Sequence, residues 1–196
     1  MLSTDFTKSE FLEASDKLLQ MGVNNSKHPF HQFVIASLDN QVIQQRTVVL
    51  RKWVLKRRSI IFHTDIRSPK VKQLKDNPNC SILFYSKEDK VQLRFKCVAH
   101  VHFQDRLCNY LYSQTTTQQQ QCYTYAIEPS HPILEKSKEQ AYENNKISKQ
   151  SAKTNFAACV CNFNELELLY LNFKSHIRIQ YNWDKFSKLT AQYLVA

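Results

Sequence analysis

Hydrophobic and polar residues alternate most regularly along residues 91–103. The side chains that point one way are those of Leu93, Phe95, Cys97, Ala99, Val101 and Phe103. The opposite positions are mostly polar or basic. A repeat of two residues is the period of a strand whose two faces have different surroundings. The pattern therefore predicts a long strand, with enough length to bend around a barrel.

Shorter apolar runs, rich in β-branched and aromatic residues, predict further strands. They cover residues 32–38, 44–54, 59–63, 80–85, 155–162, 166–173, 176–183 and 189–194. Short polar turns, such as the one at Asn40, separate the first of them and favour an antiparallel meander. At least eight strands with few helices predict a mainly β fold, an antiparallel barrel that is closed or partly open.

Helical spacing is found in three segments. Residues 8–21 have apolar side chains at helical spacing, and Gly22 is expected to end that helix. Ser68 and Pro69 suit the N-cap and first position of a helix that ends before Pro78, and residues 105–113 predict a third helix. We expect residues 1–27 to form a helical extension packed on a barrel domain of residues 28–196. A polar excursion of that domain is expected at about 129–155.

The charge balance favours an anionic partner, although a basic surface kept for solubility is an alternative. The chain has 27 Lys and Arg against 17 Asp and Glu, a net charge of +10. The basic residues are scattered, so no nucleic-acid partner is expected. No apolar run approaches ~18 residues, so we expect no membrane-spanning helix. The polar N-terminus lacks a secretory signal pattern, which indicates a cytoplasmic protein with reduced cysteines and no metal site.

A single glycine, Gly22, excludes the glycine-rich loops that bind phosphate through the backbone. Any phosphate must be held by side chains and a helix end instead. Residues 62–70, FHTDIRSPK, offer such a site, because a strand end leads through a loop into the start of a helix. The side chains that would surround an anion there are Thr64, Arg67, Ser68 and Lys70. A well-capped surface helix with basic neighbours is the alternative interpretation.

Three other places carry candidate polar groups. Arg46 and Arg51 stand at the two ends of an apolar strand segment, and Gln92 lies on the polar side of the long strand. His176 and Arg178 share a face of a later strand. Taken one at a time, each of these is equally a solvated surface group.

In their order and spacing, the segments RTVVLR, FHTDIRSPK, NPNCSILFY, VQLRFKCVAHV and HIRIQY resemble a known family. It is the pyridoxamine 5'-phosphate oxidase-related flavoproteins, which are FMN-binding split β-barrels. The similarity runs from about His28 to the C-terminus. It is greatest to a branch of uncharacterised oxidase-like proteins with T-D-x-R-S-x-K after the third strand. The resemblance implies a homodimer that holds FMN at the subunit interface.

The resemblance also implies which side chains contact FMN. Arg46 and Lys70 match the ligands of the FMN phosphate, with Arg67 and Ser68 as further phosphate ligands of the branch. The strand along the flavin is matched by Thr47, Val48, Val49, Leu50 and Arg51. His63 and Thr64 match a pair of residues at the end of the next strand. Gln92 matches a glutamine near the flavin ring, and Arg178 matches an arginine that contacts the flavin.

Departures from the family pattern affect the substrate. Gln114 stands where a true pyridoxamine 5'-phosphate oxidase has a substrate-binding arginine, and Leu169 replaces a flavin-facing tryptophan. Lys174 and His176 match an Arg-x-His substrate motif, with a lysine that cannot form a bidentate contact. We therefore expect an FMN-dependent oxidoreductase acting on an unknown small molecule, with phosphorylated molecules among the candidates. A true pyridoxamine or pyridoxine 5'-phosphate oxidase and a non-catalytic flavin- or haem-binding protein are the alternatives. No residue is assigned a catalytic role.

Overall fold

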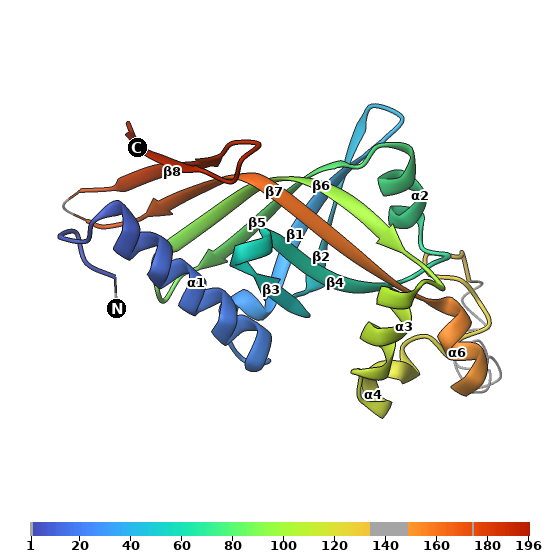
Figure 1. Ribbon diagram of the computed structural model, residues 1–196. Coiled ribbons are helices and arrows are strands. Elements are labelled where there is room, and N and C mark those ends of the chain that lie inside the picture. The colour runs from blue at the N-terminus through green and yellow to red at the C-terminus, as the bar shows by residue number, and fades with distance from the viewer. Residues whose placement is uncertain (1, 134–148, 174) are drawn as a thin grey trace.

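The computed structural model describes residues 2–133, 149–173 and 175–196. Within them, nine strands form one antiparallel sheet (Figure 1). The strands are β1 (Gln32–Asp39), β2 (Val42–Val49), β3 (Lys52–Val54), β4 (Ser59–Asp65), β5 (Asn79–Ser86), β6 (Val91–His102), β7 (Phe156–Tyr170), β8 (Ile177–Trp183) and β9 (Leu189–Leu194). Their order is β2-β1-β5-β6-β7-β4-β3, with β8 and β9 continuing from β7. Most of the predicted polar excursion, and Lys174, lie outside the described residues.

The sheet curls into a split barrel, as the sequence predicts. β2 and β3 lie at opposite edges of the sheet, yet only Leu50 and Arg51 separate them along the chain. The Leu50 N–H donates to the His31 carbonyl at 2.8 Å, and the Arg51 N–H donates to the Ile61 carbonyl at 2.9 Å. This segment therefore passes from one edge to the other without a continuous ladder between β2 and β3, which leaves the barrel split.

The barrel interior is filled by aromatic side chains from the inward-facing positions of the strands. Along β6, buried and exposed residues alternate as the sequence pattern predicts. Trp53 stacks on Phe163 with ring centroids 5.5 Å apart, and Phe95 meets Phe163 edge-on at 4.9 Å. Aromatic pairs of this kind add to the stabilisation that burial of their area provides.

Helix α1 (Lys8–Asn24) covers one side of the barrel (Figure 1). Its Phe11 and Leu19 are fully buried in the same core as the barrel aromatics. The Trp53 indole N–H donates to Asp16 of this helix at 2.6 Å. These contacts make the helix part of the barrel's packing.

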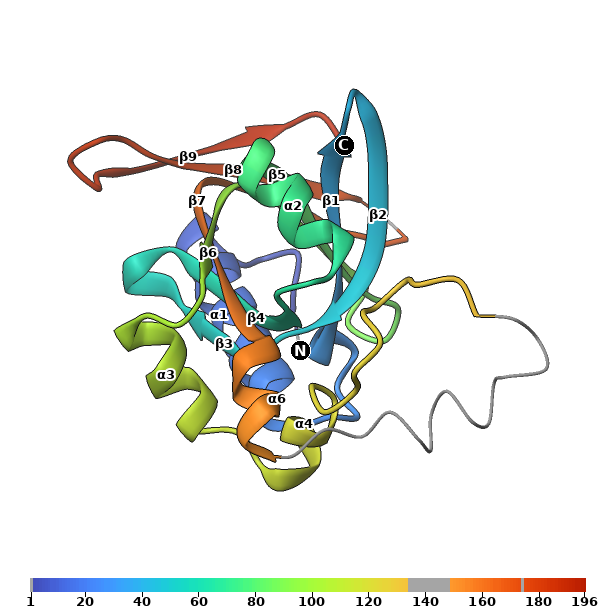
Figure 2. The same ribbon diagram turned by 90° about the vertical axis from the view of Figure 1, so that its right-hand side faces the viewer.

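Three short helices gather at one end of the molecule (Figure 2). They are α3 (Arg106–Ser113), α4 (Thr117–Gln121) and α6 (Lys149–Asn155). Beneath them lies a second, smaller apolar cluster on the outer side of β4 and β7, built around Ile61, Tyr123 and Phe156. Helix α2 (Pro69–Asp76) lies apart from this group, against β1 and β6.

Several predicted boundaries are wrong. The strand expected at 44–54 is two strands, because the chain changes partner between β1 and β4. The strands expected at 155–162 and 166–173 are the single strand β7, which pairs with β4 along one part and with β8 along another. The polar run of Thr and Gln residues at 115–121 contains α4, which begins with a capping box between Thr116 and Gln119.

No helix among the described residues has both the length and the apolar character needed to cross a membrane.

Gly22 lies within α1 and does not end it, because the helix continues to Asn24. A Cβ atom at Gly22 would lie 2.5 Å from the carbonyl oxygen of Phe30. The glycine is therefore required by the close approach of the helix to the segment that leads into β1.

We expect Gly22→Ala to destabilise the protein by roughly 1–3 kcal/mol, because backbone must move to relieve the contact. Helix propensity alone predicts the opposite, a gain of about 1 kcal/mol. Urea unfolding of the variant beside Gln20→Ala, at an exposed position of the same helix, measures the sign. A more stable Gly22→Ala protein would contradict the steric argument.

Candidate functional site

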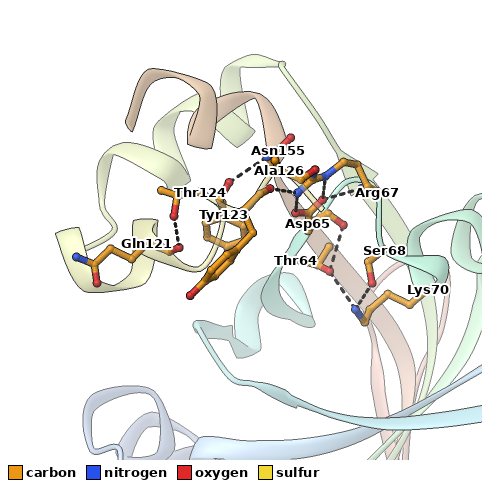
Figure 3. Close-up of polar contacts among 11 residues, drawn as sticks. Thr64, Asp65, Arg67, Ser68, Lys70, Gln121, Tyr123, Thr124, Ala126 and Asn155 are labelled. Carbon is orange, nitrogen blue, oxygen red and sulfur yellow. Dashed lines mark hydrogen bonds and ion pairs between the residues drawn. The ribbon is translucent and has the colours of Figure 1, made fainter. Parts of the chain in front are cut away.

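A cluster of polar side chains lies where β4 ends and α2 begins (Figure 3). The Lys70 ammonium donates hydrogen bonds to the hydroxyls of Thr64, at 3.3 Å, and Ser68, at 2.5 Å. Both hydroxyl residues are buried. Although Ser68 is the N-cap residue of α2, its side chain makes no capping hydrogen bond to the helix. The cluster therefore combines a lysine, two hydroxyls and a helix start, the combination that suits an anion.

Arg46 joins this cluster from β2. Its guanidinium donates to the Ser37 hydroxyl at 2.6 Å and to the side-chain oxygen of Gln73 at 2.7 Å. Ser37 donates to the same Gln73 oxygen at 2.8 Å, and Gln73 donates to Asp39 at 3.1 Å. Neutral groups from β1 and α2 thus fix the orientation of the guanidinium.

The cluster contains two cations, Arg46 and Lys70. Among the described residues, neither Arg46 nor Lys70 takes part in an ion pair; Asp39 and Asp65 act on them only at longer range. Burial lowers the pKa of Lys70, and the charge of Arg46 lowers it further. Burial also lowers the pKa of Arg46. Both shifts show that the charged forms are disfavoured, and a bound anion would reverse them.

Arg67, a sequence-predicted anion ligand, is already engaged. Its guanidinium forms a bidentate contact with Asp65, at 2.9 and 2.7 Å, and reaches the carbonyls of Tyr125 and Ala126. Figure 3 shows this side chain directed away from Lys70. The hydrogen bonds to Asp65 raise the pKa of Arg67. In this chain Arg67 therefore ties the loop after β4 to the segment that follows α4.

His63 and Arg51 belong to a second group, on the outer side of β4. The His63 ring packs edge-on against Phe156 at 4.8 Å, and its Nε2 is buried without a hydrogen-bond partner among the described residues. Burial and the charge of Arg51 lower the pKa of His63 to about 4. Burial raises the pKa of the neighbouring Tyr123. The imidazole is thus neutral near pH 7 and keeps one polar atom free for a ligand.

Gln92 and Arg178 lie on the outer face of the sheet, in one row across its strands. Gln92 is opposite Leu169, and Leu169 is opposite Arg178. Arg178 donates to Glu167 at 2.9 and 2.7 Å, and Arg94 donates to the same carboxylate at 2.9 Å. Thr47, opposite Val34, faces outward as well.

The sequence-predicted residues therefore separate onto two faces of the sheet. Arg46 is opposite the inward-facing Ile35, so Arg46 and Val48 share the inner face, and Leu50 is fully buried. Thr47 and Val49 share the outer face with Gln92 and Arg178. His176 is exposed just before β8. We call Arg46, Lys70, Thr64 and Ser68 the inner cluster, and Gln92 with Arg178 the outer row. Because the sheet separates them, the inner cluster and the outer row of one chain cannot contact the same small molecule.

Three residues of the site escaped the sequence analysis. Ser37 and Gln73 orient Arg46, and Tyr123 packs against Phe156, the ring that His63 also contacts. For Ser37 a signal existed, because it occupies the buried face of its strand, where Phe33 and Ile35 precede it. Gln73 likewise follows Val71 on the buried side of α2.

The described residues contain no cluster of three or more His, Cys, Asp or Glu side chains arranged for a metal ion. A cavity of about 690 Å³ opens beside the cluster and shares Ser37 with it, but neither Arg46 nor Lys70 lines it.

The family model for the FMN-binding domain of pyridoxamine 5'-phosphate oxidase matches residues 13–103. This part of the chain, slightly less than half of it, is similar to the FMN-binding domain of that family. FMN is therefore the cofactor, and the resemblance inferred from the motifs is confirmed. The matched region contains the inner cluster and Gln92 but ends before Arg178.

Solved structures share the fold of the whole chain. An FMN-binding, pyridoxamine 5'-phosphate oxidase-related protein from Nostoc punctiforme PCC 73102 has a TM-score of 0.79 and 16% identity, over 99% of this chain and 100% of that one. PhzG from Burkholderia lata 383, solved with tetrahydrophenazine-1-carboxylic acid, has a TM-score of 0.73 and 15% identity, over 100% and 98%. A protein related to general stress protein 26 from Clostridium acetobutylicum has a TM-score of 0.56 and 10% identity, over 88% of this chain and 95% of that one. Among curated proteins, none matches this sequence.

The FMN-binding domain should lose stability on acidification because of His63. Its pKa is about 4 in the fold, against an ordinary value of 6.5, so between these values the unfolded chain binds the proton and the fold does not. The free energy of unfolding should fall from pH 6.5 toward pH 4 by up to roughly 3 kcal/mol from this residue alone.

Urea unfolding at pH 7 and pH 4.5 measures the effect. We expect His63→Gln to lose much less stability between the two pH values than the unmodified protein. His100→Gln, at an exposed position of β6, should behave as the unmodified protein does. Equal pH dependence in all three proteins would refute a buried neutral His63.

Proposed function

We propose that the protein is an FMN-dependent oxidoreductase that holds the FMN phosphate between Arg46 and Lys70. The observation that carries this proposal is the pair of half-buried cations at the start of α2, oriented by neutral groups and lacking an ion-pair partner among the described residues. A phosphate monoester carries close to two negative charges at pH 7 and accepts several hydrogen bonds. It would supply the missing counter-charge and engage the hydroxyls of Thr64 and Ser68.

The other residues proposed to contact FMN extend from this phosphate site along β2 and β4. The strand from Thr47 to Arg51 leads from the phosphate cluster toward His63, whose free Nε2 is available to the flavin ring or to a substrate. Bound FMN supplies the electron-transfer chemistry. The chain binds the phosphate, presents a neutral imidazole and excludes water with the apolar cluster beneath α3 and α6. Arg67 contributes its charge and shapes the loop through Asp65.

A homodimer with FMN in the seam is part of the proposal. The inner cluster and the outer row of Gln92 and Arg178 lie on opposite faces of one sheet, so one flavin can meet both sets only when they come from two chains. The outer face also carries exposed apolar groups, among them Tyr85, which is 51% exposed. A second copy of the chain would cover them.

The substrate is proposed to be a small molecule other than pyridoxamine 5'-phosphate. Gln114, at the position of the family's substrate-binding arginine, is a neutral, exposed residue at the end of α3. A neutral amide cannot replace the two charge-assisted hydrogen bonds of a guanidinium to a phosphate. A cytoplasmic location completes the proposal, because all six cysteines are free, as thiols are in reducing compartments.

We expect Arg46→Ala and Lys70→Met each to weaken FMN binding about 30-fold or more, since losing one partner of a buried charged contact costs ~2–5 kcal/mol. Riboflavin lacks the phosphate, so its affinity should change little in the same variants. Fluorescence titration of the apoprotein with both flavins measures this. The absorbance spectrum of the purified protein separates flavin from haem.

Lys72→Met is the matched control, because Lys72 is an exposed lysine on the same helix. It should leave both affinities unchanged. Unchanged FMN affinity in both Arg46→Ala and Lys70→Met would refute the assignment of the phosphate site.

Light scattering of the FMN-loaded protein should give about twice the chain mass of 23.1 kDa. A monomer at micromolar concentration that still binds FMN tightly would contradict the placement of the cofactor between chains.

A further inference from the structure

Three buried cysteines converge inside the barrel, beside the cavity that shares Ser37 with the cluster around Arg46 and Lys70. Cys80 on β5 lies directly opposite Cys97 on β6 in the strand register. Cys161 on β7 lies opposite Ala99, two residues from Cys97 on the same face of β6. The thiols of Cys97 and Cys161 both lie close enough to Cys80 to lower the pKa of its thiol. None of the three takes part in a disulfide.

The cysteines are reachable from one side. Cys80 and Cys97 form part of the wall of the cavity of about 690 Å³, where Lys96 also lies. Their residues are 8% and 5% exposed, whereas Cys161 is fully buried. A small polar molecule in the cavity therefore lies against Cys80 and Cys97 but not against Cys161.

The three thiols differ in acidity. The neighbouring thiols of Cys161 and Cys97 lower the pKa of Cys80, while the pKa values of Cys97 and Cys161 are raised. Cys159, on the same strand as Cys161, shows the effect of burial, which raises its pKa to about 12. The thiolate is the reactive form of cysteine, so the cluster concentrates reactivity on Cys80.

We propose that Cys80 and Cys97 form a dithiol that reacts with hydrogen peroxide or a small organic hydroperoxide admitted through the cavity. The Cys80 sulfur attacks one peroxide oxygen, the O–O bond breaks, and water or an alcohol leaves, which gives a sulfenic acid. The Cys97 thiol then attacks the Cys80 sulfur, an S–S bond forms, and water leaves. Two thiols are oxidised by two electrons, and one peroxide is reduced.

The register identifies Cys97 as the partner that closes the disulfide. Residues directly opposite on antiparallel strands have Cα atoms about 4.5–5.5 Å apart, within the range of about 4.4–6.8 Å that a disulfide spans. Cys161 lies on β7, and β6 runs between β7 and β5, so its backbone is two strand spacings, roughly 9–10 Å, from that of Cys80 and too far to bridge. Cys161 therefore acts on the pKa of Cys80 and does not compete for the disulfide. This site is independent of FMN and of the proposed oxidoreductase activity.

The test treats the full chain with one equivalent of hydrogen peroxide at pH 7 and then removes the excess with catalase. Free thiols are capped with iodoacetamide in denaturant before tryptic digestion and mass analysis. Cys80 and Cys97 fall in separate tryptic peptides, 76–87 and 97–106, and neither contains another cysteine. We expect these peptides to be joined by a disulfide that dithiothreitol cleaves. Cys80 should also be consumed at least about tenfold faster than the exposed Cys122.

Variants assign the two roles. Cys97→Ser should leave a sulfenic acid on peptide 76–87 that dimedone traps, and Cys80→Ser should abolish both products. Cys122→Ser, which removes an exposed cysteine outside the cluster, should leave the cross-link unchanged. If the unmodified protein yields the two peptides separately, each capped, or if Cys122 is oxidised first, the proposal is overturned. That outcome does not depend on whether any variant folds.

Discussion

A single segment of chain, β2 through Leu50 and Arg51 into β3, joins the two edges of the sheet. Its backbone donates to His31 near one edge and to Ile61 at the other, so it determines how the barrel curls. Alternation along the segment then assigns its side chains. Arg46 faces inward toward α2, Thr47 faces outward, and Arg51 comes to lie beside His63. The positions of the Arg46 and His63 groups follow from this one crossing.

The site is held in an electrostatically unfavourable state by well-packed neighbours. Two cations lie close together near the start of α2, and the groups that orient them are two serines, a threonine and a glutamine. Carboxylates at those positions would stabilise the chain alone but would compete with any incoming phosphate. The neutral partners therefore give up folding stability in favour of affinity for an anion.

Much of the fold could be predicted because its strands have one buried face. The alternation along β6 fixed both its length and its orientation, and Ser68 with Pro69 marked the start of α2. The division of 44–54 and the continuity of β7 could not be predicted, because both depend on which strands pair. The same limit applies to the site. Arg46 and Lys70 came from a motif, whereas Gln73, 27 residues after Arg46, meets it only through the tertiary fold.

Arg67 has a consequence for how the molecule responds to its ligands. Its guanidinium donates hydrogen bonds to Asp65, two residues earlier in the chain, and to the carbonyls of Tyr125 and Ala126, 58 and 59 residues later. The loop that leads into the phosphate cluster and the segment after α4 thus share one rigid connector. Any ligand that orders one of them lowers the entropy that remains to be lost when the other is ordered. By thermodynamic reciprocity, a contact made near Tyr125 and Ala126 and an anion bound near Lys70 then strengthen each other to the same degree.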